Sequence, residues 1–268
     1  MAGKNAGSSA AHRMPVLFIG HGSPENALSD NAFTRAMSRL GKELPKPRAI
    51  LCISAHWLTE GTAATAMDAP KTIHDFYGFP PPLYTVKYPA PGSPELAARV
   101  QRLLKPIQAG LDASWGLDHG TWSVLRHMYP SANIPVVQLS IDFYKPAQHH
   151  YEIGKKLAPL REEGILIIGS GNMVHNLRAL SPDGRDAAPV AWAKQFDAFI
   201  KEALEKKDHK AIINYQSLGQ VAALAHPTPD HFYPLLYAMG AAGVKSKISY
   251  PYEGYEYGSL SMRAVKLD

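Results

Sequence analysis

Three histidines follow stretches of the sequence that have the composition of buried β-strands. His21 comes directly after LFIG, His56 after ILCISA, and His175 after ILIIGSGNMV. Ligands of α/β proteins bind beyond the carboxyl ends of parallel strands, so we expect the three imidazoles to meet there. Glycine on both sides of His21 lets the backbone turn sharply and project the imidazole over the sheet. Because a neutral imidazole is a common metal ligand, this pattern predicts a metal site.

Two further histidines are candidates for the same site. His231 lies in PTPDHFYPLL, where a Pro-Thr-Pro turn would begin a helix with His231 on its first turn, whereas nearby His226 is interpreted as a loop residue. His119, in DHGTW, is either a site residue or a helix-entry residue that bonds to the backbone. We interpret the remaining histidines of the tail and the predicted helices as surface or helix-packing residues: His12, His127, His149, His150 and His209.

A long loop rich in proline and aromatic residues spans residues 72–92, TIHDFYGFPPPLYTVKYPAPG. Loops of this length inside a compact domain are commonly functional. Its side chains can line a pocket for a flat ligand, and the candidates are His74, Phe76, Tyr77 and Phe79. The alternative is a packed surface loop.

The metal-binding signatures CxxC, HExxH and the EF-hand loop are absent from the sequence. This argues against a structural zinc site, a zincin protease and a calcium loop. An all-histidine site with open positions suits one divalent ion, either Zn(II) or Fe(II), because imidazole is an acceptable ligand for both.

Apolar runs that alternate with amphipathic segments predict the elements that position these histidines. We expect buried strands at 14–20, 48–57, 134–142 and 165–172, a weaker strand at 62–67, and two final strands at 247–254 and 259–267. Helices are predicted at 30–44 behind an Asp30 cap, at 93–105 behind Ser93, at 146–164 up to Gly164, at 191–207 and at 227–243. The pattern predicts a single α/β domain over residues 14–268, with a mostly parallel central sheet covered by helices on both faces and a disordered tail at 1–13.

The composition of the 268 residues narrows the function further. The formal charge is +5, but basic and acidic residues alternate, so we expect no nucleic-acid binding. The sequence has no membrane-length apolar run and its start lacks the apolar segment of a secretory signal, which predicts a cytoplasmic protein without membrane contact. The single cysteine, Cys52, is expected to pack in the core.

Eight strings of the sequence, in order from about Met14 to the C-terminus, resemble one family: GHGSPENAL, SAHW, TIHDFYGFP, YPAPGSPELA, DHGTWSVL, IPVVQLSID, SGNMVHNLR and PTPDHFYPLL. The chain resembles the DODA-type extradiol ring-opening dioxygenases, the 4,5-DOPA dioxygenase family of the class III extradiol enzymes. The resemblance implies a non-haem Fe(II) that binds a catechol through its two hydroxyl oxygens, with O₂ beside it.

Carried over to this sequence, the resemblance implies that His21, His56 and His231 are metal ligands. It implies that His175 is the catalytic acid/base and also able to reach the metal, and that His119 hydrogen-bonds bound oxygen or a substrate hydroxyl. The better-known class III enzymes have a glutamate as third ligand, where this chain has a histidine. A neutral ligand set also suits zinc.

The expected function is extradiol cleavage of DOPA or a related catechol by O₂, with the aromatic loop stacking on the substrate. The net positive charge would weakly favour a carboxylate-bearing catechol. A zinc-dependent hydrolase and a non-enzymatic metal-binding adaptor of the same fold are the alternatives. The sequence leaves the physiological catechol, the ion and the oligomeric state open.

Overall fold

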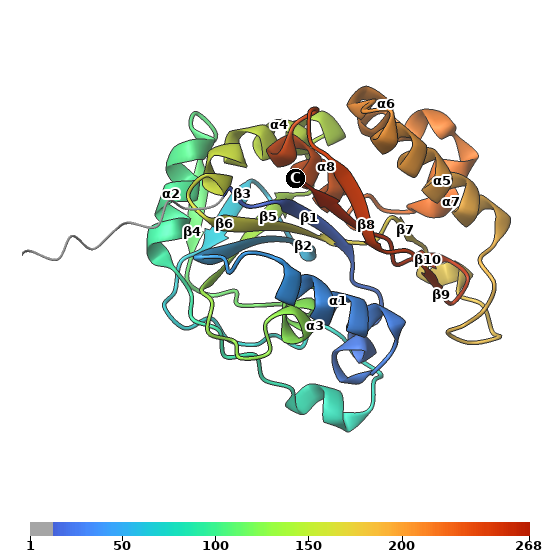
Figure 1. Cartoon of the computed structure of the whole chain (residues 1–268), viewed down its shortest axis with the longest axis horizontal. Coiled ribbons are helices and arrows are strands. Elements are labelled where there is room, and N and C mark those ends of the chain that lie inside the picture. Colours follow the sequence, from blue (N-terminus) through green and yellow to red (C-terminus); the bar gives the residue numbers. More distant parts are fainter. Residues whose placement is uncertain (1–12) are drawn as a thin grey trace, which may run out of the picture.

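A large sheet runs through the middle of the computed structural model, which describes residues 13–268 (Figure 1). The strand order is β4-β3-β5-β2-β6-β1-β11-β8, and the predicted tail lies outside the described residues except for Arg13, which pairs with Glu162 at 2.8 Å. The strands are β1 (Val16–Gly20), β2 (Ala49–Thr59), β3 (Thr62–Thr65), β4 (Ala109–Asp112), β5 (Val136–Asp142), β6 (Ile165–Gly171), β8 (Ile248–Tyr252) and β11 (Ala264–Leu267).

The four central strands, β5, β2, β6 and β1, run parallel. The pairs β3–β5, β1–β11 and β11–β8 are antiparallel, while β3 and β4 pair in parallel at the far edge. A second sheet of three short strands joins β7 (Val174–His175), β10 (Leu260–Ser261) and β9 (Tyr255–Glu256). The predicted α/β class with a mostly parallel central sheet is confirmed.

Helices cover both faces of the large sheet (Figure 1). The α-helices are α1 (Ala32–Glu43), α2 (Pro94–Leu104), α3 (His119–Met128), α4 (Ala147–Leu157), α5 (Ala191–Glu205), α6 (His209–Ile213), α7 (Gln220–Ala225) and α8 (Tyr233–Ala242). Helices α1 and α3 pack on one face, and α4 and α8 pack on the other. Within the described residues, no helix is both long and apolar enough to cross a membrane.

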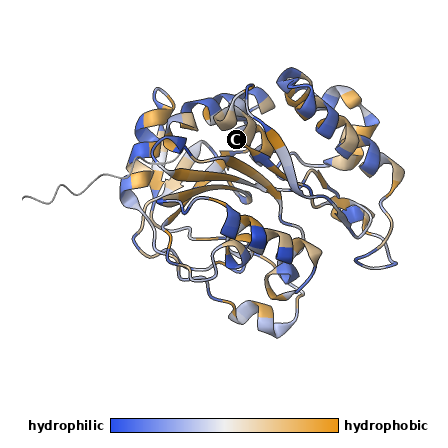
Figure 2. Ribbon diagram, viewed as in Figure 1, coloured by the Kyte–Doolittle hydropathy of each residue, from blue (hydrophilic) through white to orange (hydrophobic). Residues whose placement is uncertain are grey.

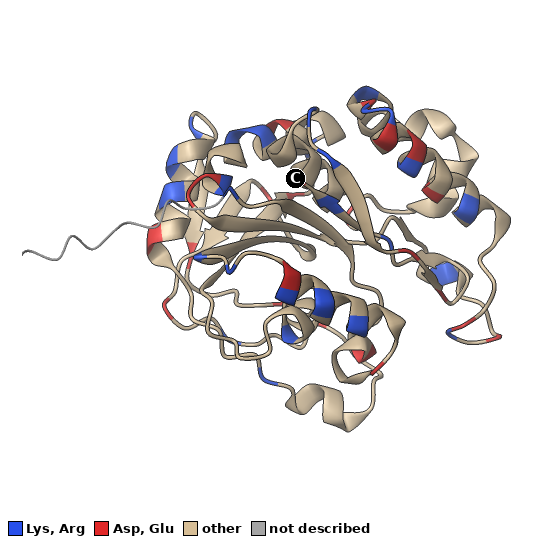
Figure 3. Cartoon of the chain, in the orientation of Figure 1, with Lys and Arg blue, Asp and Glu red and all other residues tan. Residues whose placement is uncertain are grey.

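The core has one apolar cluster on each face of the sheet. Alternate side chains of the parallel strands enter opposite clusters: Phe18 and Leu51 pack on the α8 side, while Ile19 and Ile50 pack on the α1 side. Strands buried on both faces are continuously apolar, which is why the strands are the hydrophobic part of the ribbon in Figure 2. Charged residues of both signs instead lie on the helices and loops (Figure 3). Cys52 is buried, as expected.

Several predicted boundaries were wrong for identifiable reasons. The cap of α1 is Asn31 rather than Asp30, because the Asn31 side chain accepts the backbone N–H of Thr34 while Thr34 bonds back. Strand β2 continues past His56 to Thr59, with an irregular register between Ile53 and Leu58.

Other elements were shorter than expected or were missed. Helix α4 ends at Leu157 and continues as a 3-10 turn that contains Pro159, which cannot donate the hydrogen bond an α-helix needs. The last predicted strand breaks into β10 and β11, and α8 begins at Tyr233, after His231. Helix α3 was not among the predicted helices, and the short elements β4, α6 and α7 were not predicted either.

Glycines allow α4 and α8 to cross closely. A Cβ added at Gly154 of α4 would lie 2.3 Å from the Tyr237 carbonyl oxygen, and one added at Gly240 of α8 would lie 2.2 Å from that of Tyr151. Both contacts are with backbone, which cannot rotate away. The two helices therefore approach each other only because these positions lack side chains.

We expect Gly154→Ala to lower the free energy of unfolding by about 1–3 kcal/mol, because separating α4 from α8 outweighs the gain of up to about 1 kcal/mol in helix propensity. Urea unfolding at neutral pH measures the change. Gln148→Ala, at an exposed position of the same helix, is the control and should stay within about 0.5 kcal/mol of the native chain. An unchanged urea midpoint for Gly154→Ala would contradict the close crossing.

Candidate active site

A cavity of about 530 Å³ opens beyond the carboxyl ends of the central strands. Five histidines line it: His21, His56, His119, His175 and His231. These are the five that the sequence singled out as metal or acid–base candidates. The sheet thus brings together residues that lie up to 210 positions apart in the chain, from His21 to His231.

His21 emerges at the end of β1 with its tautomer fixed. Its Nδ1 lies 3.0 Å from the Oγ of Ser170 on the adjacent strand β6. The Ser170 hydroxyl donates its own proton to the Gly120 carbonyl at 2.5 Å, so it can only accept from Nδ1–H. The lone pair of His21 is therefore on Nε2.

The flanking glycines of His21 have steric roles. Gly22 has a φ of +62°, which favours glycine, and a Cβ at Gly20 would lie 2.8 Å from the Ser261 carbonyl oxygen. This explains the sequence GHG at the end of the first strand.

His231 has the same arrangement around a different partner. Its Nδ1 is hydrogen-bonded to the carboxylate of Asp230, while its Nε2 is buried and has no hydrogen-bond partner among residues 13–268. Burial alone would raise the pKa of Asp230, but the hydrogen bond from His231 holds that pKa below its usual value. A buried nitrogen without a partner is costly, so the position of Nε2 points to a ligand.

His56 completes a group of three imidazoles. Its Nε2 lies 3.0 Å from Nε2 of His21, and ligand nitrogens of His21, His56 and His231 lie within 4.8 Å of one another. The pKa values of His21 and His56 are well below the usual 6.5, first because of burial and then because neighbouring histidines repel a second charge. These imidazoles are neutral at neutral pH, so the group fits a divalent ion that accepts nitrogen ligands.

Sequence reasoning missed Asp75, whose carboxylate is the hydrogen-bond partner of His119. Its carboxylate accepts both Nδ1–H and the backbone N–H of His119, each at 2.9 Å, and lies 3.5 Å from Nδ1 of His56. Burial would raise the pKa of Asp75, but hydrogen bonds from His119 lower it. Asp75 directly follows His74 in the aromatic loop. A carboxylate adjacent to a candidate histidine was the one sequence signal that could have pointed to Asp75.

His119 is the first residue of α3, behind the cap Asp118. His119 therefore enters a helix, as the alternative interpretation expected, but its imidazole bonds to the Asp75 carboxylate rather than to the backbone, and it lines the cavity.

His175 lies on β7, outside the large sheet, and its ring stacks on that of His231 with centroids 3.4 Å apart. Its pKa is lowered well below 6.5, first by burial and then by His231. His175 also forms a possible ligand group with Asp230 and His231. Its position is therefore compatible with either of the roles expected for it.

The aromatic loop contributes Phe76, Tyr77 and Phe79 to the cavity wall. Phe76 meets the ring of His119 edge-on, with centroids 5.6 Å apart, while Tyr77 is 92% exposed at the rim. His74 does not line the cavity, because its Nε2 bonds to the Val86 carbonyl at 3.0 Å. The expected contact of His74 with substrate is therefore corrected. His74 instead supports Phe76, whose ring it meets edge-on.

His226, which the sequence predicts in a loop, is the C-cap of α7. It is buried away from the cavity, with Nε2 3.0 Å from the Met173 carbonyl oxygen.

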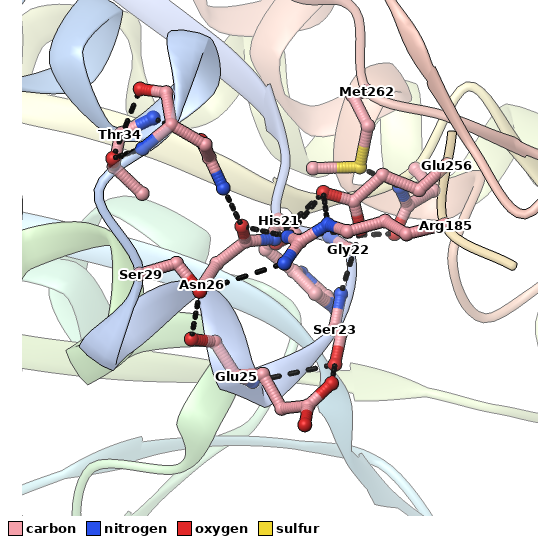
Figure 4. Close-up of polar contacts among 12 residues, drawn as sticks. His21, Gly22, Ser23, Glu25, Asn26, Ser29, Thr34, Arg185, Glu256 and Met262 are labelled. Atoms are coloured by element: carbon pink, nitrogen blue, oxygen red, sulfur yellow. Dashed lines mark hydrogen bonds and ion pairs between the residues drawn. The ribbon is translucent and has the colours of Figure 1, made fainter.

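A buried polar network holds the backbone of His21 (Figure 4). The side chain of Asn26 donates to the His21 carbonyl at 3.3 Å and to the carboxylate of Glu256 at 3.1 Å. Arg185 binds the same carboxylate at 2.6 Å and also donates to Asn26. The loop that follows β7 is thereby tied to the loop that carries His21.

Comparison with known proteins gives the reaction class of this site. The family described as the catalytic LigB subunit of aromatic ring-opening dioxygenase matches residues 8–262. The chain belongs to the LigB family of extradiol dioxygenases. This LigB-family enzyme is 52% identical over 259 residues to a 4,5-DOPA dioxygenase extradiol of Escherichia coli (strain K12), with 95% of each chain covered.

A second relative is a 4,5-DOPA dioxygenase extradiol of Beta vulgaris, 43% identical over 257 residues, covering 94% of this chain and 95% of the relative. The crystal structure of an uncharacterized protein from Escherichia coli K12 matches with a TM-score of 0.84 and 47% identity, over 96% of this chain and 100% of that one. The LigB-family assignment confirms the family suggested by the sequence and makes extradiol ring cleavage the reaction class.

We expect Ser170→Ala to lower the affinity of the site for a divalent ion by about 10–100-fold, because the orientation and tautomer of His21 lose their partner. Competition with a chelator measures the affinity of each metal-loaded variant for the ion. Ser140→Ala is the matched control, since Ser140 is a buried serine of β5 whose Oγ bonds to Thr59 and Ala63. Equal affinities for the two variants would show that Ser170 does not orient a ligand.

Proposed function

We propose that this enzyme cleaves the ring of DOPA or a related catechol next to its diol with O₂, using Fe(II) held by His21, His56 and His231. The observation that carries the proposal is the buried Nε2 of His231, which has no hydrogen-bond partner in the described part of the chain and lies near the facing Nε2 atoms of the other two imidazoles. Three neutral ligands leave coordination positions open for the two substrates. When bound, the ion supplies Lewis acidity toward the catechol hydroxyls and a site for O₂ beside the ring.

His119 orients the substrate hydroxyl in this proposal. Because Asp75 accepts its Nδ1–H, the lone pair of His119 is on Nε2 and can accept a hydrogen bond from a hydroxyl. The second bond, from the backbone N–H of His119 to Asp75, keeps the carboxylate from turning away. Phe76, edge-on to the same imidazole, offers an apolar surface for the aromatic ring.

His175 acts as the proton acceptor and donor. Burial and the adjacent His231 keep its imidazole neutral at neutral pH, so it can take a proton from the catechol and return it after ring opening. As a neutral imidazole, its ring accepts that proton at the one nitrogen that carries a lone pair. Its place on the cavity wall, stacked on His231, puts it beside the three proposed ligands.

The direct test is to load the protein anaerobically with Fe(II) and then add L-DOPA and O₂. We expect a yellow ring-opened product and uptake of one O₂ per catechol, since both oxygen atoms enter the product. A parallel sample loaded with Zn(II) is assayed for ester and amide cleavage. Hydrolysis with zinc, together with no oxygen uptake with Fe(II), would favour the hydrolase and refute the proposal.

We expect His175→Ala to lower kcat by about 10²–10⁴-fold while the bound metal stays near that of the native enzyme, because an acid/base is lost and the three ligands remain. Oxygen uptake and metal analysis of the same sample give both quantities. His149→Ala, a partly buried histidine of α4 outside the cavity, is the control and should retain full activity. Loss of the metal from His175→Ala would show that His175 acts mainly as a metal ligand rather than as an acid/base.

A further inference from the structure

Glu25 is a charged residue of the cavity wall that the proposed mechanism does not use. Among the described residues that line the cavity, Glu25 and Asp75 are the only carboxylates, and no lysine or arginine is present. Asp75 is already bound by two N–H groups of His119. Apart from the ion proposed among the histidines, the side chains that line the cavity therefore present a negative charge, although the whole chain carries +5.

The contacts of Glu25 leave its charge uncompensated. It lies on a 3-10 helix, η1 (Pro24–Leu28), where its carboxylate accepts only a long hydrogen bond of 3.4 Å from the Ser23 hydroxyl. Within residues 13–268, no basic side-chain nitrogen lies within 4.0 Å of this carboxylate. Arg185, the cation of the neighbouring network, is bound to Glu256 at 2.6 Å (Figure 4).

Tyr257 lines the same cavity as Glu25. The pKa of its hydroxyl is raised first by burial and then by the charge of Glu25, while Arg185 lowers it. Its backbone is fixed at a φ of +52°, with its N–H bonded to the Arg185 carbonyl at 2.8 Å and its carbonyl bonded to the N–H of Ser181 at 2.9 Å. An aromatic ring and a carboxylate in the wall of one cavity together form a favourable surface for an organic ammonium group.

We propose that Glu25, together with the ring of Tyr257, selects catechols whose side chain carries a positively charged amine over catechols that carry only a carboxylate. The inference rests on the proposed function, since it assumes that the diol end of the substrate lies among the histidines. A catechol with only a carboxylate would place two negative charges together in a half-buried cavity without a basic lining residue. This reverses the preference that the net charge of the sequence suggested.

The test compares the binding of catechols with different side-chain charges to the Fe(II)-loaded enzyme without O₂, so that affinity is measured apart from turnover. The probes are dopamine, which carries an amine, 3,4-dihydroxyphenylpropionate, which carries a carboxylate, and 4-ethylcatechol, which is neutral. We expect dopamine to bind about tenfold or more tightly than the carboxylate, with L-DOPA, which carries both groups, between them.

Glu25→Gln should lower the dopamine-to-ethylcatechol affinity ratio about tenfold, and Glu25→Lys should make the carboxylate the tighter of the two charged probes. Glu95→Gln, an exposed glutamate at the start of α2, is the control and should keep the native ratio. If none of these catechols, L-DOPA included, binds and is opened when oxygen is admitted, the proposed function itself fails. If catechols bind and are opened while the Glu25 variants keep the native ratios, only the role of Glu25 is refuted.

Discussion

The tautomers of the clustered imidazoles determine what this site can bind. A neutral imidazole has one free lone pair, on the nitrogen opposite the one that donates its proton, so the partner of Nδ1 decides where that lone pair faces. Ser170 is that partner for His21, Asp230 for His231 and Asp75 for His119. Each partner leaves Nε2 free. Without these three acceptors, the same histidines could turn their protons toward one another and offer no common binding position.

The parallel sheet supplies those partners through its register. Strand β6 pairs with β1 so that Ser170 lies beside Ile19, two residues before His21 in the chain. A slip of one residue would turn the Ser170 side chain to the opposite face and remove the acceptor from His21. The apolar clusters on both faces penalise such a slip, because it would turn every core side chain of the strand away from its cluster. The packing of the sheet thus protects the geometry of the site.

Local charge and overall charge differ in this protein. The surplus of basic residues is spread over helices and loops, where solvent screens it (Figure 3). The cavity instead has carboxylates in its wall: Asp75 is bonded to His119, and Glu25 has only a long bond from the Ser23 hydroxyl. A substrate inside the cavity responds to the nearby groups, because electrostatic interactions in a half-buried site are screened less than those at the surface.

The central strands, most of the long helices and the five histidines of the cavity were predictable from the sequence, because hydrophobic periodicity and histidines at strand ends are local patterns. Eight strings in order also identified the family. The contacts of Asp75, the bond of His74 to the Val86 carbonyl and the position of Glu25 in the cavity wall emerge only from the folded chain. These depend on which loops meet above the sheet. Contacts between loops depend on how distant segments pack together, so they cannot be predicted from a short stretch of sequence.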